Sequence, residues 1–169
     1  MIFHPKNQGK GAVLIDGIKI ASGKAIIIQD ADLEYSPSDW QRMLNELETN
    51  KWTAVYGSRE LNAKRRGYPL FVFGTRLLSF VINLIFKTNL TDSYTCYKLF
   101  KAGFLKSLNL KSKGFEIEAE ITVKTLKAGG KITEVPISYN PRTFKQGKHI
   151  RVKDGIKGLM AIIRYAIEE

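Results

Sequence analysis

The sequence predicts one α/β domain built on a mostly parallel sheet. Two short, β-branched apolar runs, residues 25–28 and 53–56, have the composition of buried strands. Helical segments precede them at residues 12–21 and 39–48, and this alternation is typical of a parallel sheet covered by helices. With 169 residues and an apolar fraction of 44%, the chain is long enough for one core and too short for two domains, so residues 1–169 form a single unit.

End signals support each of these first elements. Gly23 follows the first helix, where a glycine commonly ends the helical conformation. The run 25–28 is apolar without alternation, so we expect a strand that is covered on both faces. Ser36 is a candidate N-cap, and Pro37 suits the first turn of the helix that follows.

The most apolar stretch lies within a helix predicted for residues 70–88. About 17 consecutive residues, at the lower limit for crossing a bilayer, carry few polar side chains. On a helical wheel those polar side chains form one narrow stripe: Thr75, Arg76, Ser79 and Asn83. Such a helix is either deeply buried or lies in a membrane surface, and the sequence leaves both alternatives open.

Three further elements follow. Residues 115–128 predict a helix that ends at Gly129 and Gly130. Residues 131–139 predict a strand that, because of Pro136, either lies at a sheet edge or bends. Residues 142–169 begin with a basic segment and end in an amphipathic helix.

Charge and composition restrict the partners and the metals. The net charge of +11 favours polyanionic partners, which are nucleic acid, acidic lipid headgroups or nucleotide phosphates, and composition does not choose among these. With one cysteine and two histidines a zinc site is not expected, so a divalent metal would need oxygen ligands.

Two aspartates follow the first predicted strand. In open α/β sheets ligands bind beyond the carboxyl ends of the strands, where Asp30 and Asp32 stand. Two carboxylates one residue apart can hold Mg²⁺ or Mn²⁺, which would neutralise a diphosphate leaving group. The alternative for an isolated Asp-Ala-Asp triplet is an Asx turn that caps the next helix.

The triplet belongs to an ordered series of motifs. The segment Gln29-Asp-Ala-Asp-Leu-Glu34, followed by Val55-Tyr-Gly-Ser-Arg59, resembles the core of family 2 glycosyltransferases, particularly the dolichol-phosphate mannose synthase and polyprenyl-phosphate glycosyltransferase branch. The resemblance covers essentially the whole chain, because further matches follow in the same order: residues 7–11, 89–100, 115–124, 134–139 and 142–148. It implies a Rossmann-like GT-A fold with a mixed, mostly parallel sheet and flanking helices.

The resemblance also implies roles for individual residues. Asp30 and Asp32 correspond to the metal-binding pair and Glu34 to a third oxygen ligand, while Arg59 corresponds to an arginine that faces substrate phosphate. Asp92 corresponds to an acidic residue near the reacting sugar.

Three cationic residues complete the candidate substrate contacts. Arg142 and Lys148 correspond to the basic segment that receives the lipid phosphate, and Lys10 is a further candidate contact. The expected catalytic residues are Asp32, Asp92 and Glu118.

Glu118 stands out within its predicted helix. Glu116 and Glu120 share a face with Lys124 and Lys127, a pattern typical of a solvated, mutually paired surface. Glu118 points between apolar flanks, so we expect either a role in handling sugar or acceptor, or a structural hydrogen bond.

The function that the resemblance implies is metal-dependent, inverting transfer of a hexose from a nucleotide-diphosphate sugar to a polyprenyl phosphate. A phosphate monoester has a second pKa of about 6, so the acceptor is a dianion at neutral pH and needs no strong general base. One alternative is transfer to a saccharide hydroxyl, for which a base such as Asp92 would be essential. Another is an inactive membrane-surface remnant. A nucleic-acid-binding module is not expected, because only Phe144 interrupts the basic residues of 142–157 with an aromatic ring.

Relatives normally begin with a strand and a segment that grips the nucleotide base, and neither is recognisable here. We therefore expect a GT-A fold that is truncated at its N-terminus, with an unpaired sheet edge, low stability or self-association, and weak donor binding. The basic run beside an amphipathic helix predicts peripheral attachment to the anionic cytoplasmic face of the membrane.

Overall fold

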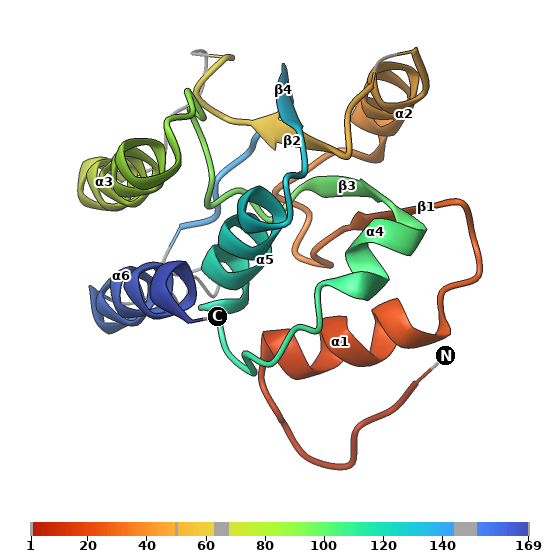
Figure 1. The fold of residues 1–169 in the computed structure, drawn as a ribbon, viewed down its shortest axis with the longest axis horizontal. Helices are drawn as coiled ribbons and strands as arrows, with labels where there is room; N and C mark the ends of the chain where they lie inside the picture. Colours follow the sequence, from red (N-terminus) through yellow and green to blue (C-terminus); the bar gives the residue numbers. More distant parts are fainter. Residues whose placement is uncertain (1, 50, 63–67, 144–151, 169) are drawn as a thin grey trace.

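A four-stranded mixed sheet lies at the centre of the computed structural model, which describes residues 2–49, 51–62, 68–143 and 152–168 (Figure 1). The strand order is β1-β3-β2-β4, and β3 pairs antiparallel with both β1 and β2, whereas β2 and β4 are parallel. The strands β1, β2 and β4 therefore run in one direction, and their carboxyl ends lie at one end of the sheet. The strand bounds are β1 (Ala25–Ile28), β2 (Ala54–Ser58), β3 (Lys98–Lys101) and β4 (Ile132–Pro136).

The mixed sheet with flanking helices predicted from the sequence is confirmed, but the sheet is not mostly parallel, because two of its three strand pairs are antiparallel. The strand β3, which the sequence did not predict, lies between β1 and β2. The expectation that β1 packs on both faces is confirmed, since Ile26 and Ile28 pack in one apolar cluster and Ala25 and Ile27 in the other. β1 is nevertheless an edge strand, in which Ile28 is buried and the other residues are half-buried. Within the described part of the chain no strand pairs with its outer edge. The position of β4 at the opposite edge, ending at Pro136, agrees with the prediction.

Helices cover both faces of the sheet. Alternate residues of each strand point to opposite faces, so Tyr56 packs with α1 (Lys10–Ile20), α4 (Ala102–Ser107) and α5 (Ile117–Lys127). Val55 on the other face packs with α2 (Trp40–Thr49), which the short 3₁₀ helix η1 (Pro37–Asp39) precedes. The N-cap prediction is confirmed, because Ser36 Oγ accepts a hydrogen bond from the Ser38 N–H.

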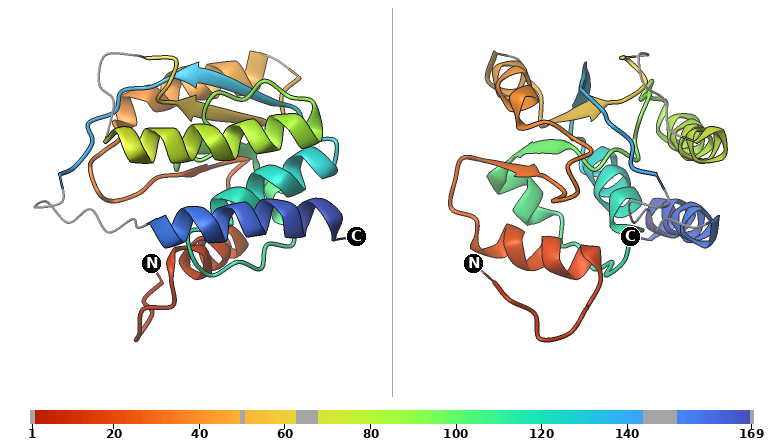
Figure 2. Two further views of the ribbon diagram at one scale, coloured as in Figure 1. Left: turned by 90° about the vertical axis from the view of Figure 1, so that its left-hand side faces the viewer. Right: turned by 180° about the vertical axis from the view of Figure 1, so that it is seen from behind.

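Two further helices lie beside α5, away from the sheet. The helices α3 (Pro69–Phe86) and α6 (Val152–Ile167) run next to each other in the views of Figures 1 and 2. Their buried residues and those of α5 form a third apolar cluster, to which α3 contributes Leu78 and Ile82, and α6 contributes Ile162. The C-terminal helix predicted from the sequence is thus present, although its inward face is not the predicted apolar stripe.

Ser79 and Asn83 of the polar stripe of α3 face the protein, whereas Arg76 of the same stripe is exposed and large apolar side chains line the outer side of the helix. Ser79 Oγ shares a hydrogen bond with Ser93, and Asn83 donates to the carbonyl of Leu90. On the outward side, the exposed fractions of Phe73 and Phe80 are 66% and 62%. Deep burial, one of the two alternatives for this helix, is therefore wrong. Among the described residues α3 is the one helix long and apolar enough to cross a membrane by length and composition.

The prediction that one face of α5 is solvated is also wrong at Glu120. Glu120 is fully buried, where its carboxylate accepts hydrogen bonds from the backbone N–H groups of Lys111 and Ser112. Lys124 Nζ lies 2.7 Å from Glu120 Oε1, in the i, i+4 pairing that was predicted. The Glu120 side chain thus satisfies backbone N–H groups of the turn before α5 rather than facing water.

Candidate active site

The two aspartates of the Asp-Ala-Asp triplet follow the carboxyl end of β1, as predicted. Both side chains are partly exposed, at 25% for Asp30 and 20% for Asp32. Leu33 has a left-handed backbone conformation, with φ of 60°, that turns the chain sharply between Asp32 and Glu34. Asp32 Oδ1 also accepts a hydrogen bond from the Glu34 N–H at 3.1 Å, so the turn alternative describes part of this geometry.

Asp30 is the outer member of a charge network that reaches into the core. Lys10 Nζ donates a hydrogen bond to Asp30 Oδ2 at 2.8 Å and lies 3.0 Å from Glu118 Oε1, without hydrogen-bond geometry at the second contact. The other oxygen of Glu118 accepts a hydrogen bond from Lys98 Nζ. Glu118 is 2% exposed and Lys98 is fully buried, so two lysines and two carboxylates balance one another inside the protein.

Close packing of glycines places Lys10 in this network. The backbone N–H of Gly11 donates to the carbonyl of Lys113 at 2.8 Å, which joins the start of α1 to the turn before α5. A Cβ at Gly11 would lie 2.1 Å from the carbonyl oxygen of Ser112, so a larger residue cannot approach in this way. The glycines around Lys10 thus allow the helix start to approach the backbone of the segment before Glu118.

The network shifts the pKa values of its members. Burial alone would raise the pKa of Glu118, but the charges of Lys98 and Lys10 outweigh it and lower that pKa to about 2. Burial alone would lower the pKa of Lys10, but Glu118 and Asp30 raise it overall. Glu118 is therefore an anion at neutral pH, fully engaged by cations, which is the geometry of an internal pair rather than of a proton donor.

Asp32 and Glu34 are held by Arg142. Arg142 Nη2 donates to Asp32 Oδ2 at 2.8 Å, and its Nε and backbone N–H both donate to Glu34 Oε1, at 3.2 and 2.9 Å. The hydroxyl of Tyr139 donates to Glu34 Oε2 at 3.1 Å. Glu34 thus connects the segment after β4 to the turn after β1.

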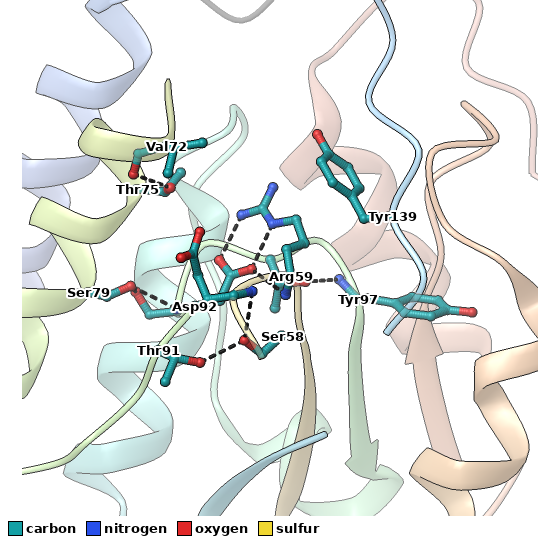
Figure 3. A network of polar contacts seen from close by, with 12 residues as sticks. Ser58, Arg59, Val72, Thr75, Ser79, Thr91, Asp92, Tyr97 and Tyr139 are labelled. Atoms are coloured by element: carbon teal, nitrogen blue, oxygen red, sulfur yellow. Dashed lines mark hydrogen bonds and ion pairs between the residues drawn. The ribbon is translucent and has the colours of Figure 1, made fainter. Parts of the chain in front are cut away.

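Arg59 and Asp92 form a second pair beyond the end of β2 (Figure 3). Arg59 Nε and Nη2 each donate to one oxygen of Asp92 at 2.7 Å, and the Arg59 N–H donates at 3.1 Å. Asp92 is 2% exposed. Burial would lower the pKa of Arg59, but Asp92 raises it well above its ordinary value, so the guanidinium stays charged. Glu134 in β4 fixes the backbone at Asp92, because its carboxylate accepts hydrogen bonds from the backbone N–H groups of Thr91 and Asp92.

One aromatic side chain connects the two arginine pairs. The guanidinium of Arg59 lies over the ring of Tyr139, 5.4 Å from its centroid. An open groove of about 420 Å³ adjoins this contact. Its lining residues are Leu33, Glu34, Tyr35, Ser36, Pro37, Asn62, Ser138, Tyr139 and Asn140. Contacts therefore run without a break from Asp32 through Arg142, Glu34 and Tyr139 to Arg59.

The model of glycosyl transferase family 2 matches residues 1–108, which is more than half of the chain. The chain belongs to glycosyltransferase family 2. Several curated proteins are similar over nearly the whole chain. An uncharacterized protein of Methanocaldococcus jannaschii is 29% identical over 171 residues, covering 97% of this chain and 70% of that protein.

The names of two further relatives include a polyprenyl phosphate. Undecaprenyl-phosphate mannosyltransferase of Micrococcus luteus is 27% identical over 159 residues, covering 88% of this chain and 63% of that protein. Dolichyl-phosphate beta-glucosyltransferase of Trichomonas vaginalis is 27% identical over 173 residues, covering 99% of this chain and 53% of that protein. The family 2 chain thus spans between about half and 70% of the length of these relatives.

Solved structures confirm the GT-A fold. Glucosyl-3-phosphoglycerate synthase of Mycobacterium tuberculosis in complex with uridine diphosphate superposes with a TM-score of 0.70 at 14% identity. The same enzyme with Mn²⁺, uridine diphosphate and glucosyl-3-phosphoglycerate gives the same TM-score at 15% identity. Each match covers 94% of the family 2 chain and 55% of the enzyme's chain.

Asp30 and Asp32 fit a metal ion that is bound jointly with substrate phosphates, rather than one that protein side chains enclose. Within the described part of the chain no group of three or more His, Cys, Asp and Glu side chains is arranged to hold a metal ion. Mg²⁺ is commonly bound by one or two carboxylates together with substrate phosphates, and the partly exposed Asp30 and Asp32 offer such a pair. Glu34 fits less well as a third ligand, because Arg142 and Tyr139 already engage both of its oxygens.

The structure brings most of the predicted site residues together and adds others. Asp30, Lys10 and Glu118 form one cluster, whereas Asp32, Glu34, Arg142, Arg59 and Asp92 lie along the other. Lys148 lies outside the described residues. Sequence reasoning missed Lys98, Glu134 and Tyr139. A lysine inside the run Tyr97-Lys98-Leu99-Phe100 was the available signal for Lys98, since a charge between apolar strand residues requires a partner.

Proposed function

We propose that this family 2 chain forms the catalytic part of an enzyme that moves a sugar from a nucleotide-diphosphate sugar to the phosphate of a polyprenyl lipid. The observation that carries the proposal is the continuous run of contacts from Asp32 to Arg59 beyond the carboxyl ends of β1, β2 and β4. It joins a carboxylate suited to a metal–diphosphate complex with two arginines suited to phosphate. The names of two relatives support a polyprenyl phosphate as the acceptor.

The chain's own residues would bind and orient the two phosphorylated substrates. A divalent cation at Asp30 and Asp32 would supply charge neutralisation for the departing diphosphate. Two hydrogen bonds to Asp92 fix the orientation of the Arg59 guanidinium, which suits Arg59 to orient an anionic acceptor. The same guanidinium also lies over the aromatic ring of Tyr139, 5.4 Å from its centroid.

The state of Asp92 favours a phosphate acceptor over a saccharide hydroxyl. A hydroxyl acceptor needs a general base within hydrogen-bond reach of the proton that it loses. Both oxygens of Asp92 accept hydrogen bonds from Arg59, and the side chain is 2% exposed. A phosphate dianion needs no such base, so the buried pair is compatible with transfer to phosphate.

Activity tests this proposal directly. The full chain is incubated with nucleotide-diphosphate sugars, Mg²⁺ or Mn²⁺, and either polyprenyl phosphate or a soluble saccharide, and organic-phase product is measured. We expect metal-dependent product with the lipid, and a loss of about a hundredfold in Asp32→Asn, the scale of one lost electrostatic contact to the transition state. Asp16→Asn, an aspartate on α1 away from the site, is the matched control. Transfer to saccharide alone would contradict the proposal.

We also propose that the protein attaches peripherally to the cytoplasmic face of an anionic membrane through α3 and α6. Exposed apolar side chains follow the outer side of both helices: Leu70, Phe73, Leu77, Phe80, Leu84, Ile85, Ile156, Met160, Ile163 and Ile167. Lys153, Lys157 and Arg164 on α6 are exposed as well, so apolar and cationic side chains occur together. The inward polar contacts of Ser79 and Asn83 hold α3 against the domain, which favours lying in the membrane surface over crossing it.

Vesicle binding tests the attachment. The protein should co-sediment with vesicles containing anionic lipid, more strongly at low salt, and less with neutral vesicles. The double variant Phe73→Ser and Phe80→Ser should weaken binding, whereas Phe3→Ser, which changes an exposed phenylalanine elsewhere, should not. Binding that ignores lipid charge and the double variant would contradict the proposal, as would a stable dimer that covers this face.

A further inference from the structure

Arg142 occupies a position that a bound cation would also favour. Its guanidinium donates to Asp32 at 2.8 Å and to Glu34 at 3.2 Å, so one positive charge is shared by the two carboxylates of the turn after β1. The two contacts come from different nitrogens, so the arginine can release one carboxylate while it keeps the other. Glu34 also receives the backbone N–H of Arg142, which anchors the segment independently of the guanidinium.

The corresponding contact of Asp30 is built differently. Lys10 binds Asp30 but is also committed to the buried Glu118, and its side chain is 12% exposed. The side chain of Arg142 is 34% exposed. Ion pairs open to solvent contribute little net stability, so the Arg142–Asp32 contact is the more easily exchanged of the two.

We infer that Arg142 is an exchangeable counter-ion of Asp32, which leaves that carboxylate when a divalent cation binds there. The inference rests on the proposed function, in which Asp30 and Asp32 bind the cation. Two cations at one carboxylate repel each other at contact distance, so the guanidinium and a divalent ion compete for Asp32. Once released from Asp32, the guanidinium still contacts Glu34 through Nε, while its Nη2 is available to donate to a phosphate group. Arg142 would thereby couple cation loading to phosphate binding, and the coupling must act in both directions.

The test measures binding of Mn²⁺ alone, by the loss of the free-ion electron paramagnetic resonance signal. Removing the competing charge in Arg142→Gln should tighten Mn²⁺ binding by about three- to fivefold, the upper range for a partly exposed ion pair. Arg142→Lys keeps the charge and should bind Mn²⁺ within about twofold of wild type, because a point charge at this distance still competes. Arg42→Gln removes an arginine that is hydrogen-bonded to the carbonyl of Pro136, and serves as the control for net charge.

The outcomes separate this inference from the proposed function. Tighter binding in Arg142→Gln alone supports the exchange. Equal or weaker binding in Arg142→Gln, with measurable binding in wild type, overturns the exchange and leaves the proposed function standing. Absence of Mn²⁺ binding in wild type and in every variant overturns the metal site and the exchange together.

A second measurement uses the wild-type protein and does not depend on the folding of a variant. In an NMR spectrum of the ¹⁵N-labelled chain, diamagnetic Mg²⁺ should shift the Nε–H signal of Arg142, which is assigned by its loss in Arg142→Lys. Addition of inorganic phosphate should shift the same signal further in the presence of Mg²⁺ than in its absence. A signal that ignores Mg²⁺ at concentrations that saturate the site would refute the exchange.

Discussion

Replacement of Glu118 by glutamine should remove a large, pH-dependent part of the folding stability. The carboxylate is 2% exposed and lies between Lys10 and Lys98, whose charges lower its pKa from 4.5 to about 2. Because the folded state holds this pKa below its unfolded value, the ionised carboxylate stabilises the fold above pH 4.5. That stability is lost as the pH falls from 4.5 towards 2.

The size of the effect follows from the pKa shift. At about 1.4 kcal/mol per pKa unit, the shift corresponds to about 3 kcal/mol of unfolding free energy at pH 7. The loss expected when one partner of a buried ion pair is removed, about 3 kcal/mol at the low end, agrees with this value. At pH 3.5 the wild-type protein has lost about 1 kcal/mol of this contribution, so the difference between wild type and Glu118→Gln should shrink to about 2 kcal/mol.

Urea denaturation followed by circular dichroism at pH 7 and pH 3.5 measures these differences. Glu48→Gln, which changes an exposed glutamate of α2, is the control and should alter stability by less than about 0.5 kcal/mol at either pH. A wild-type advantage over Glu118→Gln that is below about 1 kcal/mol at pH 7 would refute the reasoning. So would an advantage that does not change with pH, because the pKa of Glu118 would then be ordinary.

Two further substitutions test the packing and the second charge pair. Gly11→Ala should lower the unfolding free energy by about 2 kcal/mol, because its Cβ would meet the Ser112 carbonyl at 2.1 Å. Gly17→Ala, in the same helix with open space around it, should raise it by about 0.5–1 kcal/mol; equal thermal shifts of both variants would disprove the close approach. Asp92→Asn should cost about 3 kcal/mol by leaving the Arg59 guanidinium without its carboxylate, and a melting temperature unchanged from wild type would argue against that pair.

Local sequence patterns predicted the elements that carry strong periodic or end signals. The helices α1, α2, α3, α5 and α6 and the strands β1, β2 and β4 were all predicted close to their observed positions. The four-residue β3 was missed, because a charged residue stands at each of its ends and no period can be read over such a length. Its place between β1 and β2 makes the sheet mixed, and only long-range pairing determines that place.

The helix α3 shows why composition could not decide which way a helix faces. Its polar stripe is narrow enough to suggest either a buried helix or a membrane-surface helix. The structure turns Ser79 and Asn83 towards the loop at 88–93, where their hydrogen bonds satisfy backbone groups that would otherwise be buried without partners. That requirement belongs to the loop rather than to the helix, so no pattern within the helix could reveal it.

The candidate site was predictable where a motif ended a strand, and unpredictable where distant charges met. Asp30 and Asp32 stand at the end of β1 as expected, and Arg59 stands at the end of β2. The partners of Glu118 come from α1 and β3, which the fold alone brings together. A helical wheel showed that Glu118 pointed to apolar flanks, but it contained no information about which cations would be there.

The charge network makes the two aspartates of the site unequal as probes of function. Asp30 is part of a balanced group with Lys10, Glu118 and Lys98, so its neutralisation leaves an excess positive charge that extends into the core. A loss of activity in Asp30→Asn would therefore combine a change in metal binding with a change in stability. Asp32 is paired with the partly exposed Arg142 and lies outside that buried group. Asp32 is consequently the residue at which a metal ligand can be removed with the least disturbance to folding, because its partner remains solvated when the carboxylate is lost.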